Sequence, residues 1–229
     1  MHIDRRLETI ANLVPQGCVL ADIGTDHAYL PVWLLEKQRI ARAIAGDIAA
    51  GPCQAARTTV AQYGQHEHVE VRQGSGLKVL SPGEADCIAI AGMGASTIIS
   101  ILEDDMEVAR SAKLLVLQPM AGAASLRAWL CSHGWQLAAE ELVDYEIIAA
   151  KRGSAPAYSA AECAVGPLLL AQEHPLLGKQ LERQLATCRQ LLENMGRSER
   201  ARASEKYKEI EALKAELEVL QNGKRSDSK

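Results

Sequence analysis

Short apolar runs alternate with longer amphipathic stretches over the first two thirds of the chain. The runs CVLADIG (18–24), ARAIAGDI (41–48) and AKLLVLQP (112–119) are apolar almost throughout, which is typical of strands buried on both faces of a parallel sheet. The stretches 50–64 and 124–134 fit helices that end near a glycine. The pattern therefore predicts alternating strands and helices.

The end of this alternating region differs from its beginning. Residues 69–77 and 85–105 hold the third and fourth strands, and residues 135–153 hold two more strands, close enough to pair as an antiparallel hairpin. A dinucleotide-binding sheet does not need that final pair, whereas the seven-stranded methyltransferase sheet has it. We expect an α/β fold, with a Rossmann-like methyltransferase domain over residues 1–153.

The pattern changes at about Gly153. Residues 153–162 read as a linker of small residues, and the segments 175–195 and 199–221 read as helices on either side of the sequence GRS. Their apolar positions are spaced by three and four, as in heptad seams. These positions are Leu181, Leu185, Cys188, Leu192 and Met195 in the first helix, and Ile210, Leu213, Leu217 and Leu220 in the second.

Two such helices joined by a short glycine turn are expected to fold back on each other. We expect an antiparallel coiled-coil hairpin as a C-terminal domain over residues 160–222. The residues after it, 223–229, read as a disordered tail.

Composition narrows the class of protein. No apolar run approaches the ~20 residues that span a bilayer, and the amphipathic N-terminus lacks a signal-peptide pattern. The six cysteines lie far apart, and the six histidines show no metal-ligand spacing. We therefore expect a cytoplasmic monomer with buried free cysteines, no metal and no membrane contact.

Charge is unevenly distributed along the chain. The net charge of −4 gives no global indication of nucleic-acid binding. Residues 1–152 hold 13 Lys and Arg against 18 Asp and Glu, whereas residues 153–229 hold 12 against 11. Positive charge is therefore enriched in the C-terminal part.

Glycine and polar residues follow the predicted strands, at the edge where open parallel sheets bind ligands. Gly24, after the first strand, permits close approach of the backbone to a ligand. Asp47, at the end of the second, is placed to accept both hydroxyls of a ribose. Ser75 and its flanking glycines follow the third and can border an adenine ring.

Two carboxylates indicate which ligand this edge holds. Asp22 and Asp26 would repel a pyrophosphate at close range, which argues against NAD. They suit a ligand with a cationic amino group and a sulfonium centre. S-adenosylmethionine has both, together with a ribose and an adenine, and is the cofactor that we expect.

Three residues of the first loop have competing interpretations. Asp26 either caps the following helix or lies near the transferred methyl group or its acceptor. His27 is either a hydrogen-bonded structural residue or a cofactor contact. Tyr29 either packs in the fold or flanks an acceptor base.

The motifs DIGTDHAYLP, GDI, GSGL, IAGMG and LQP occur in an order and at separations that resemble a known family. This is the TrmK family of bacterial tRNA (adenine-N1)-methyltransferases, which modify adenine 22. The resemblance covers nearly the whole chain. It implies S-adenosylmethionine as cofactor and tRNA as substrate, with cofactor contacts at Asp22, Gly24, Thr25, Asp26, His27, Asp47, Ile48, Gly74, Ser75, Gly76, Ala91, Gly92 and Met93.

The chain departs from the family pattern at three places. Ala95 and Met120 replace residues that are usually glycine and asparagine, and the turn between Glu141 and Tyr145 is shorter than usual. The fourth strand is followed by AGMG and not by the NPPY-type motif of exocyclic amino methylation, which favours a ring nitrogen. Adenine N1 has an available lone pair, so no strong base is needed beforehand. We expect Asp26 and Tyr29 to act as catalytic residues by contacting the acceptor base.

A stacked tRNA base must be extruded to reach the donor, while phosphate contacts hold the rest of the tRNA. The turn GRSERAR places Arg197, Arg200 and Arg202 together, either as a solvated turn or as a clamp on the tRNA backbone. Two other functions compete with tRNA methylation. One is methylation of another RNA base or a small molecule, and the other is cofactor binding by an adaptor without catalysis.

Overall fold

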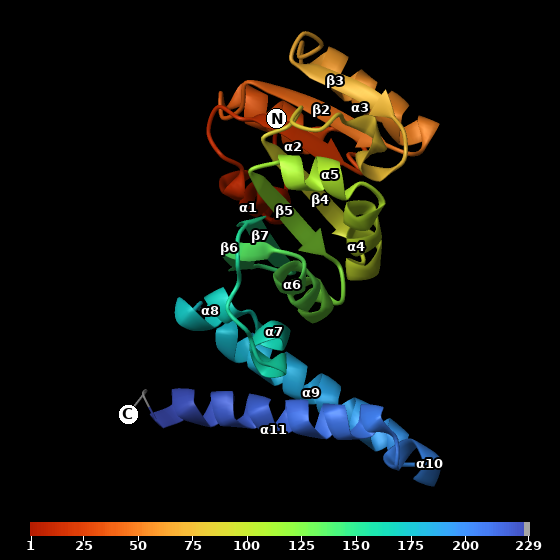
Figure 1. Cartoon of the computed structure of the whole chain (residues 1–229). Coiled ribbons are helices and arrows are strands. Elements are labelled where there is room, and N and C mark those ends of the chain that lie inside the picture. The colour runs from red at the N-terminus through yellow and green to blue at the C-terminus, as the bar shows by residue number, and fades with distance from the viewer. Residues whose placement is uncertain (227–229) are drawn as a thin grey trace. The chain divides into compact units, whose positions relative to one another are not determined.

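The computed structural model describes residues 1–226 and divides the chain into two compact units (Figure 1). The first unit is Met1–Pro156, and the second begins at Ala157. No helix among the described residues is both long and apolar enough to cross a membrane.

A seven-stranded sheet forms the centre of the first unit. Its strand order is β3-β2-β1-β4-β5-β7-β6, and β7 is antiparallel to both of its neighbours. This arrangement confirms the predicted methyltransferase sheet, including the final hairpin. The strands are β1 (Val19–Ile23), β2 (Arg42–Asp47), β3 (Val69–Gln73), β4 (Cys87–Met93), β5 (Leu114–Pro119), β6 (Trp135–Leu142) and β7 (Glu146–Arg152).

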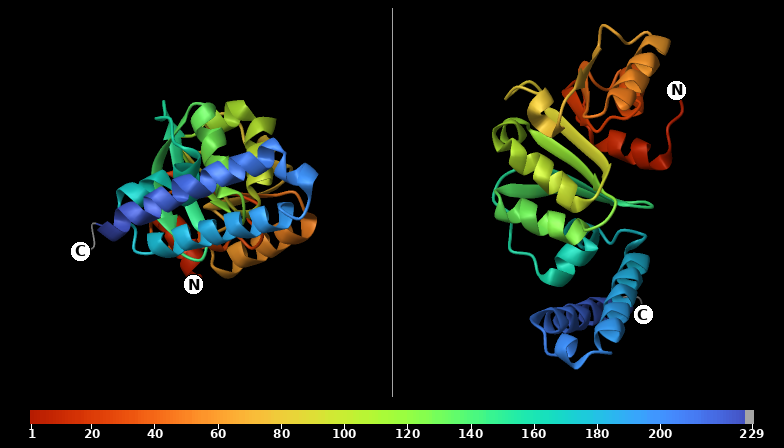
Figure 2. Two further views of the ribbon diagram at one scale, coloured as in Figure 1. Left: turned by 90° about the horizontal axis from the view of Figure 1, so that it is seen from below. Right: turned by 90° about the vertical axis from the view of Figure 1, so that its right-hand side faces the viewer.

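Helices cover both faces of the sheet, with α1, α2 and α3 on one side and α4 and α6 on the other (Figure 2). The central strands are buried because both faces are covered, which explains their continuous apolar runs. The helices of this unit are α1 (Arg5–Leu13), α2 (Tyr29–Glu36), α3 (Ala50–Gln62), the 3₁₀ turn η1 (Gly76–Val79), α4 (Ala95–Asp104), α5 (Met106–Ser111) and α6 (Ala123–Ser132).

A buried ion-pair cluster joins α6 to the final hairpin. The fully buried side chain of Arg127 pairs with Glu140 of β6 and with Glu146 of β7, the latter at 2.6 Å. The hydrophobic pattern predicted the two strands but not this polar cluster. A buried charge is tolerated only when its partners surround it, and here those partners come from separate elements.

The second unit is helical. Helices α9 and α11 pack together, and the chain reverses direction between them (Figure 1). Of the predicted seam residues, five are buried: Leu181, Leu185, Cys188, Ile210 and Leu217. The others are half-buried, and supercoiling of the pair stays a prediction. The helices are α7 (Ala160–Val165), α8 (Pro167–Ala171), α9 (Leu177–Met195), α10 (Glu199–Arg202) and α11 (Glu205–Ser226).

Three boundaries in this unit differ from the prediction. The expected linker ends early, because Ser159 and Glu162 form a capping box that starts α7. The second long helix is interrupted after Arg202, where Ser204 accepts from the amide of Tyr207 at the start of α11. The expected tail is helical up to Ser226, and its remaining residues, 227–229, lie outside the described part of the chain.

The cysteines are unpaired, as expected. All six are free, and five of them are buried; Cys131 is half-buried. Burial raises the pKa of the Cys18 thiol to about 11, with the negative charge of Asp86 acting in the same direction. Such a thiol is inert near neutral pH and serves as a small apolar side chain.

Candidate active site

The carboxyl ends of β1, β2 and β3 meet at one edge of the sheet. Asp47 of β2 pairs in register with Gln73 of β3. The amides of Gly24 and Thr25 both donate to the carbonyl oxygen of Gly46, at 2.8 and 3.1 Å. The loop after β1 is therefore hydrogen-bonded to the end of β2, which fixes its position relative to Asp47.

Gly24 combines a turn conformation with close packing against Met93. Its φ of +74° lies in the left-handed region. A Cβ atom at this position would lie 2.1 Å from the terminal methyl of Met93. The backbone turn therefore favours glycine, and a larger residue here would also displace the end of the Met93 side chain.

Two hollows, of about 240 and 230 Å³, meet at Gly24. We call the one on the Asp22 side the first hollow and the one on the Asp47 side the second hollow. Among the residues expected from the sequence, the first hollow is lined by Asp22, Gly24, Thr25, Asp26, His27, Tyr29, Ala91 and Gly92. The second hollow is lined by Gly24, Asp47, Ile48, Gly74, Ser75, Gly76 and Met93.

Asp22 is a buried carboxylate that lines the first hollow. Its Oδ2 accepts a hydrogen bond of 2.6 Å from the hydroxyl of Thr25. Burial raises the pKa of Asp22 to about 6, although the Thr25 hydrogen bond and the charge of Arg6 lower it. A cation bound in this hollow would offset the cost of holding Asp22 ionised.

Asp26 does not cap the helix that follows it. The N-cap of α2 is Ala28, which makes no side-chain capping bond, so the capping interpretation is wrong. Asp26 has a φ of +53°, and its exposed carboxylate lies 3.7 Å from Nε2 of His27. Non-glycine residues are uncommon in this region of backbone space, although Asp adopts it more often than most, and this conformation occurs within the loop that lines the first hollow.

His27 and Tyr29 form a stacked pair beside Asp26. Their ring centroids are 5.0 Å apart and their planes differ by 7°. Tyr29 is 43% exposed although it begins a helix with buried neighbours. It is therefore not a core residue, and the pair presents aromatic surface at the first hollow.

Asp47 and Ile48 both line the second hollow. Asp47 Oδ1 accepts the amide of Ala49 at 2.9 Å, which orients the carboxylate at the end of β2. Ile48 is 68% exposed. The second hollow thus offers a carboxylate next to an exposed apolar side chain, a combination that suits a ribose joined to a flat base.

The first hollow has a polar lining residue that the sequence did not predict, and that residue is held by a buried glutamine. Arg6 of α1 lines it, and Nη1 of Arg6 donates to Oε1 of Gln118 at 2.9 Å. Gln118 is fully buried and also accepts the amide of Gly92 at 3.1 Å. The glutamine within the apolar run LLVLQP was a signal, since a buried polar side chain needs partners, but its partners could not be read from the chain.

The three arginines proposed to contact RNA lie at the connection between α9 and α11. All three are exposed. Arg197 pairs with Glu193 at 3.5 Å, and Nε of Arg202 donates to the carbonyl oxygen of Gly196. Arg197 thus lies in the turn after α9, Arg200 and Arg202 lie in the short helix α10, and part of their charge is engaged locally.

The sheet order with its antiparallel β7, together with paired hollows at the ends of β1 and β2, defines a class I methyltransferase. Residues 3–151 match the model of the family described as Methyltransferase domain. The chain is 34% identical over 230 residues to the tRNA (adenine(22)-N(1))-methyltransferase of Bacillus subtilis (strain 168), covering 96% of each protein. The chain belongs to this tRNA (adenine(22)-N(1))-methyltransferase family, as the sequence motifs predicted.

Solved structures support the same grouping. The Bacillus subtilis m1A22 tRNA methyltransferase TrmK superposes with a TM-score of 0.87 at 32% identity, covering 96% of this chain and 99% of that one. Sp1610 of Streptococcus pneumoniae, solved in complex with S-adenosyl-L-methionine, has a TM-score of 0.83 at 31% identity, covering 96% and 100%.

Proposed function

We propose that this chain transfers a methyl group from S-adenosylmethionine to N1 of adenine 22 in tRNA. The observation that carries the proposal is its 34% identity over 96% of its length to the Bacillus subtilis enzyme of that name. The two adjoining hollows agree with it, because their side chains suit the two halves of the cofactor.

The second hollow suits the adenosine half. The Asp47 carboxylate is a ribose-hydroxyl acceptor, and Ser75 and Ile48 border the space for the adenine. The first hollow suits the methionine half, since Asp22 is an acceptor for an ammonium group and Arg6 a donor to a carboxylate. When bound, the cofactor supplies an electrophilic methyl group on a sulfonium centre.

The residues around the first hollow suit methylation of an adenine at N1. N1 of a neutral adenine attacks through its own lone pair, so no residue has to remove a proton beforehand. The methylated ring is cationic, and the exposed Asp26 carboxylate stabilises that developing charge. The stacked rings of His27 and Tyr29 offer a face on which an extruded base can stack.

Labelled S-adenosylmethionine, bulk tRNA and nucleoside mapping test the reaction directly. Label in 1-methyladenosine at position 22 is expected, whereas label at another base or in no RNA contradicts the proposal. Binding of the cofactor without any methylation would instead identify an adaptor. A cytoplasmic location and a monomeric state stay predictions from the sequence.

Asp26→Asn tests the electrostatic role. We expect kcat to fall by about tenfold or more, because the developing positive charge loses its carboxylate, while binding of S-adenosylhomocysteine stays measurable. The exposed Asp104 at the end of α4 provides the control, Asp104→Asn. Equal turnover of the two variants would remove Asp26 from the mechanism.

A further inference from the structure

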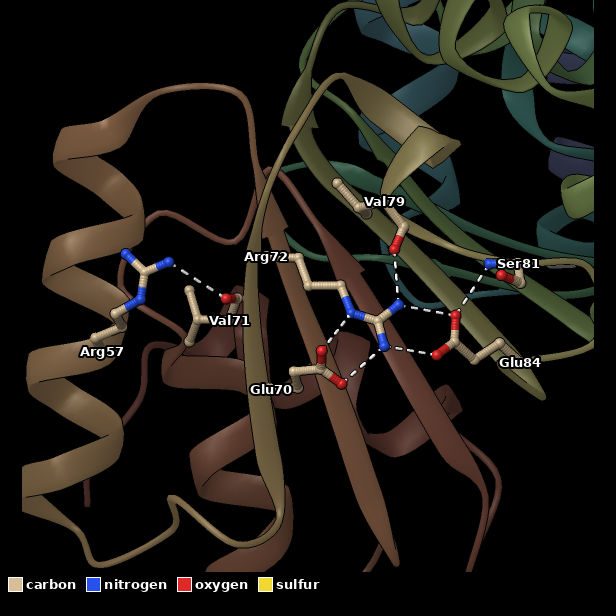
Figure 3. A network of polar contacts seen from close by, with 7 residues as sticks. All are labelled: Arg57, Glu70, Val71, Arg72, Val79, Ser81 and Glu84. Atoms are coloured by element: carbon tan, nitrogen blue, oxygen red, sulfur yellow. Dashed lines mark hydrogen bonds and ion pairs between the residues drawn. The ribbon is translucent and has the colours of Figure 1, made fainter.

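Arg72 on β3 uses all five N–H groups of its guanidinium (Figure 3). Nε and Nη2 donate to the two oxygens of Glu70, at 2.8 and 2.7 Å. Nη1 and Nη2 donate to the two oxygens of Glu84, at 2.8 and 2.6 Å. Nη1 also donates to the carbonyl oxygen of Val79 at 2.8 Å. We call these four residues the Arg72 network.

The Arg72 network brackets the loop that lines the second hollow. Gly74, Ser75 and Gly76 lie between Arg72 and Val79 in the chain, and all three line that hollow. The bond from Arg72 to the Val79 carbonyl therefore ties the two ends of this loop together. Glu84 accepts the amide of Ser81 at 2.9 Å, which also holds the chain just after Val79.

Val79 links the network to the backbone of the hollow. A Cβ atom at Gly74 would lie 2.7 Å from one methyl of Val79, and a Cβ atom at Gly46 would lie 2.8 Å from the other. The Val79 side chain thus packs directly against Gly74, which follows β3, and against Gly46 near the end of β2. A shift of Val79 would move the backbone beside the adenosine half of the proposed ligand.

We propose that Arg72 is a positioning residue for the adenosine half of the cofactor, acting through Val79 on the Gly46 and Gly74 backbone. The inference rests on the function proposed above. It does not place Arg72 in contact with the cofactor, since Arg72 does not line either hollow. The charge-assisted, bidentate geometry makes this network stronger than an ordinary surface ion pair.

A matched control lies on the same edge of the sheet. Arg57 of α3 donates one bond, of 3.4 Å, to the carbonyl oxygen of Val71, and it lines neither hollow (Figure 3). Arg57→Met and Arg72→Met remove the same charge from the same region. Only the second removes the tie to Val79.

Two ligands separate the halves of the site, namely S-adenosylhomocysteine and 5′-methylthioadenosine, which lacks the amino-acid group. We expect Arg72→Met to raise the Kd of both by about tenfold, because the adenosine half is displaced. Arg57→Met should stay within about twofold of the wild type. In tRNA methylation, Arg72→Met should raise the KM for cofactor and leave kcat at saturating cofactor within about twofold. A general loss of folding would instead lower the apparent kcat and leave KM unchanged.

Glu84→Ala is a second test, because it removes two of the bonds that hold the Arg72 guanidinium. It should raise the Kd of S-adenosylhomocysteine and the Kd of 5′-methylthioadenosine by the same factor. Equal affinities of the Arg72→Met and Arg57→Met proteins for both ligands would overturn the inference alone. A rise confined to S-adenosylhomocysteine would also overturn it, because the effect would then lie in the methionine half. A wild-type protein that binds neither ligand would overturn the proposed function as well.

Discussion

At the scale of single residues, Asp22 shows how a binding site conflicts with stability. Its carboxylate is buried, with Thr25 as a hydrogen-bond donor and the charge of Arg6 nearby. The free protein holds this group at a pKa of about 6 because burial penalises the charged form. A cationic ligand removes the conflict, which makes the raised pKa consistent with a functional carboxylate.

Asp22→Asn should raise the free energy of unfolding at pH 8 by on the order of 1–3 kcal/mol. The folded-state pKa lies above the unfolded value of 3.8. The stability contributed by Asp22 is therefore fully present below that value and is lost as pH rises through about 6. Thermal unfolding at pH 5 and pH 8 measures the effect, which should be larger at pH 8.

The same substitution should weaken ligand binding. For the wild type, the affinity for S-adenosylhomocysteine should increase as pH rises from 5 to 7, because Asp22 must be ionised to accept from the ammonium group. The pKa of Glu84 is held at about 2 by Arg72, so the Arg72 network does not change over this range. Calorimetric titration of Asp22→Asn should show weaker affinity without this increase; a parallel increase in both proteins would contradict the role of Asp22.

At the scale of elements, the turn between β1 and α2 determines the geometry of both hollows. Gly24 lies in each of them, and its amide is bonded to Gly46 at the end of β2. One glycine thus links the two halves of the site. The Met93 methyl on the neighbouring strand occupies the space that a side chain at Gly24 would need.

Gly24→Ala should weaken ligand binding as well as lower the stability of the fold. The left-handed φ costs an alanine roughly 1–2 kcal/mol, and Met93, which lines the second hollow, must move away. We expect the Kd of S-adenosylhomocysteine to rise by about fivefold or more.

Gly17→Ala is the matched control for this prediction. Gly17 has a φ of +72° and no atom within 4 Å of its added Cβ. Both variants should show a similar loss of thermal stability, measured by calorimetry, but only Gly24→Ala should bind the ligand more weakly. Similar ligand affinity in both would show that Met93 adjusts without disturbing the second hollow.

At the scale of the whole molecule, charge is divided between the two units. Residues 1–152 carry a balance of −5 and residues 153–229 a balance of +1. An acidic methyltransferase domain is poorly suited to hold the phosphates of a tRNA, because like charges repel. We therefore propose that the arginines at the α9–α11 connection contribute to tRNA binding.

Replacing Arg197, Arg200 and Arg202 by alanine should weaken tRNA binding by about tenfold at physiological salt. The slope of log K against log salt should fall in magnitude by about 2, since fewer counterions are released. Filter binding over a salt series measures both quantities, and S-adenosylhomocysteine affinity should be unchanged.

A second triple variant, with alanine at Lys179, Arg183 and Arg189, makes the same charge change along α9. All three side chains are exposed. If both triple variants lose tRNA affinity equally, the effect is one of net charge, and the α9–α11 connection has no particular role.

Local signals account for what was predictable. Apolar or alternating runs located the seven strands, and residues at the ends of β1, β2 and β3 line the two hollows because parallel strands end on the same side. The helix boundaries that were predicted wrongly depend on local side-chain hydrogen bonds to the backbone, which composition does not show. Ser159 and Glu162 cap α7 within a stretch that composition alone described as linker, and α10 separates from α11 around Ser204.

By itself, the sequence determined the methyltransferase sheet, the class of ligand and the family, because each follows from residue types in short segments and from the order of those segments along the chain. Only the tertiary structure decided which distant side chains contact one another around the candidate site. Arg6 meets Gln118 across 112 residues of chain, and Arg72 reaches Glu84 across an intervening turn. Such contacts depend on how the elements pack, and no local pattern along the chain encodes them.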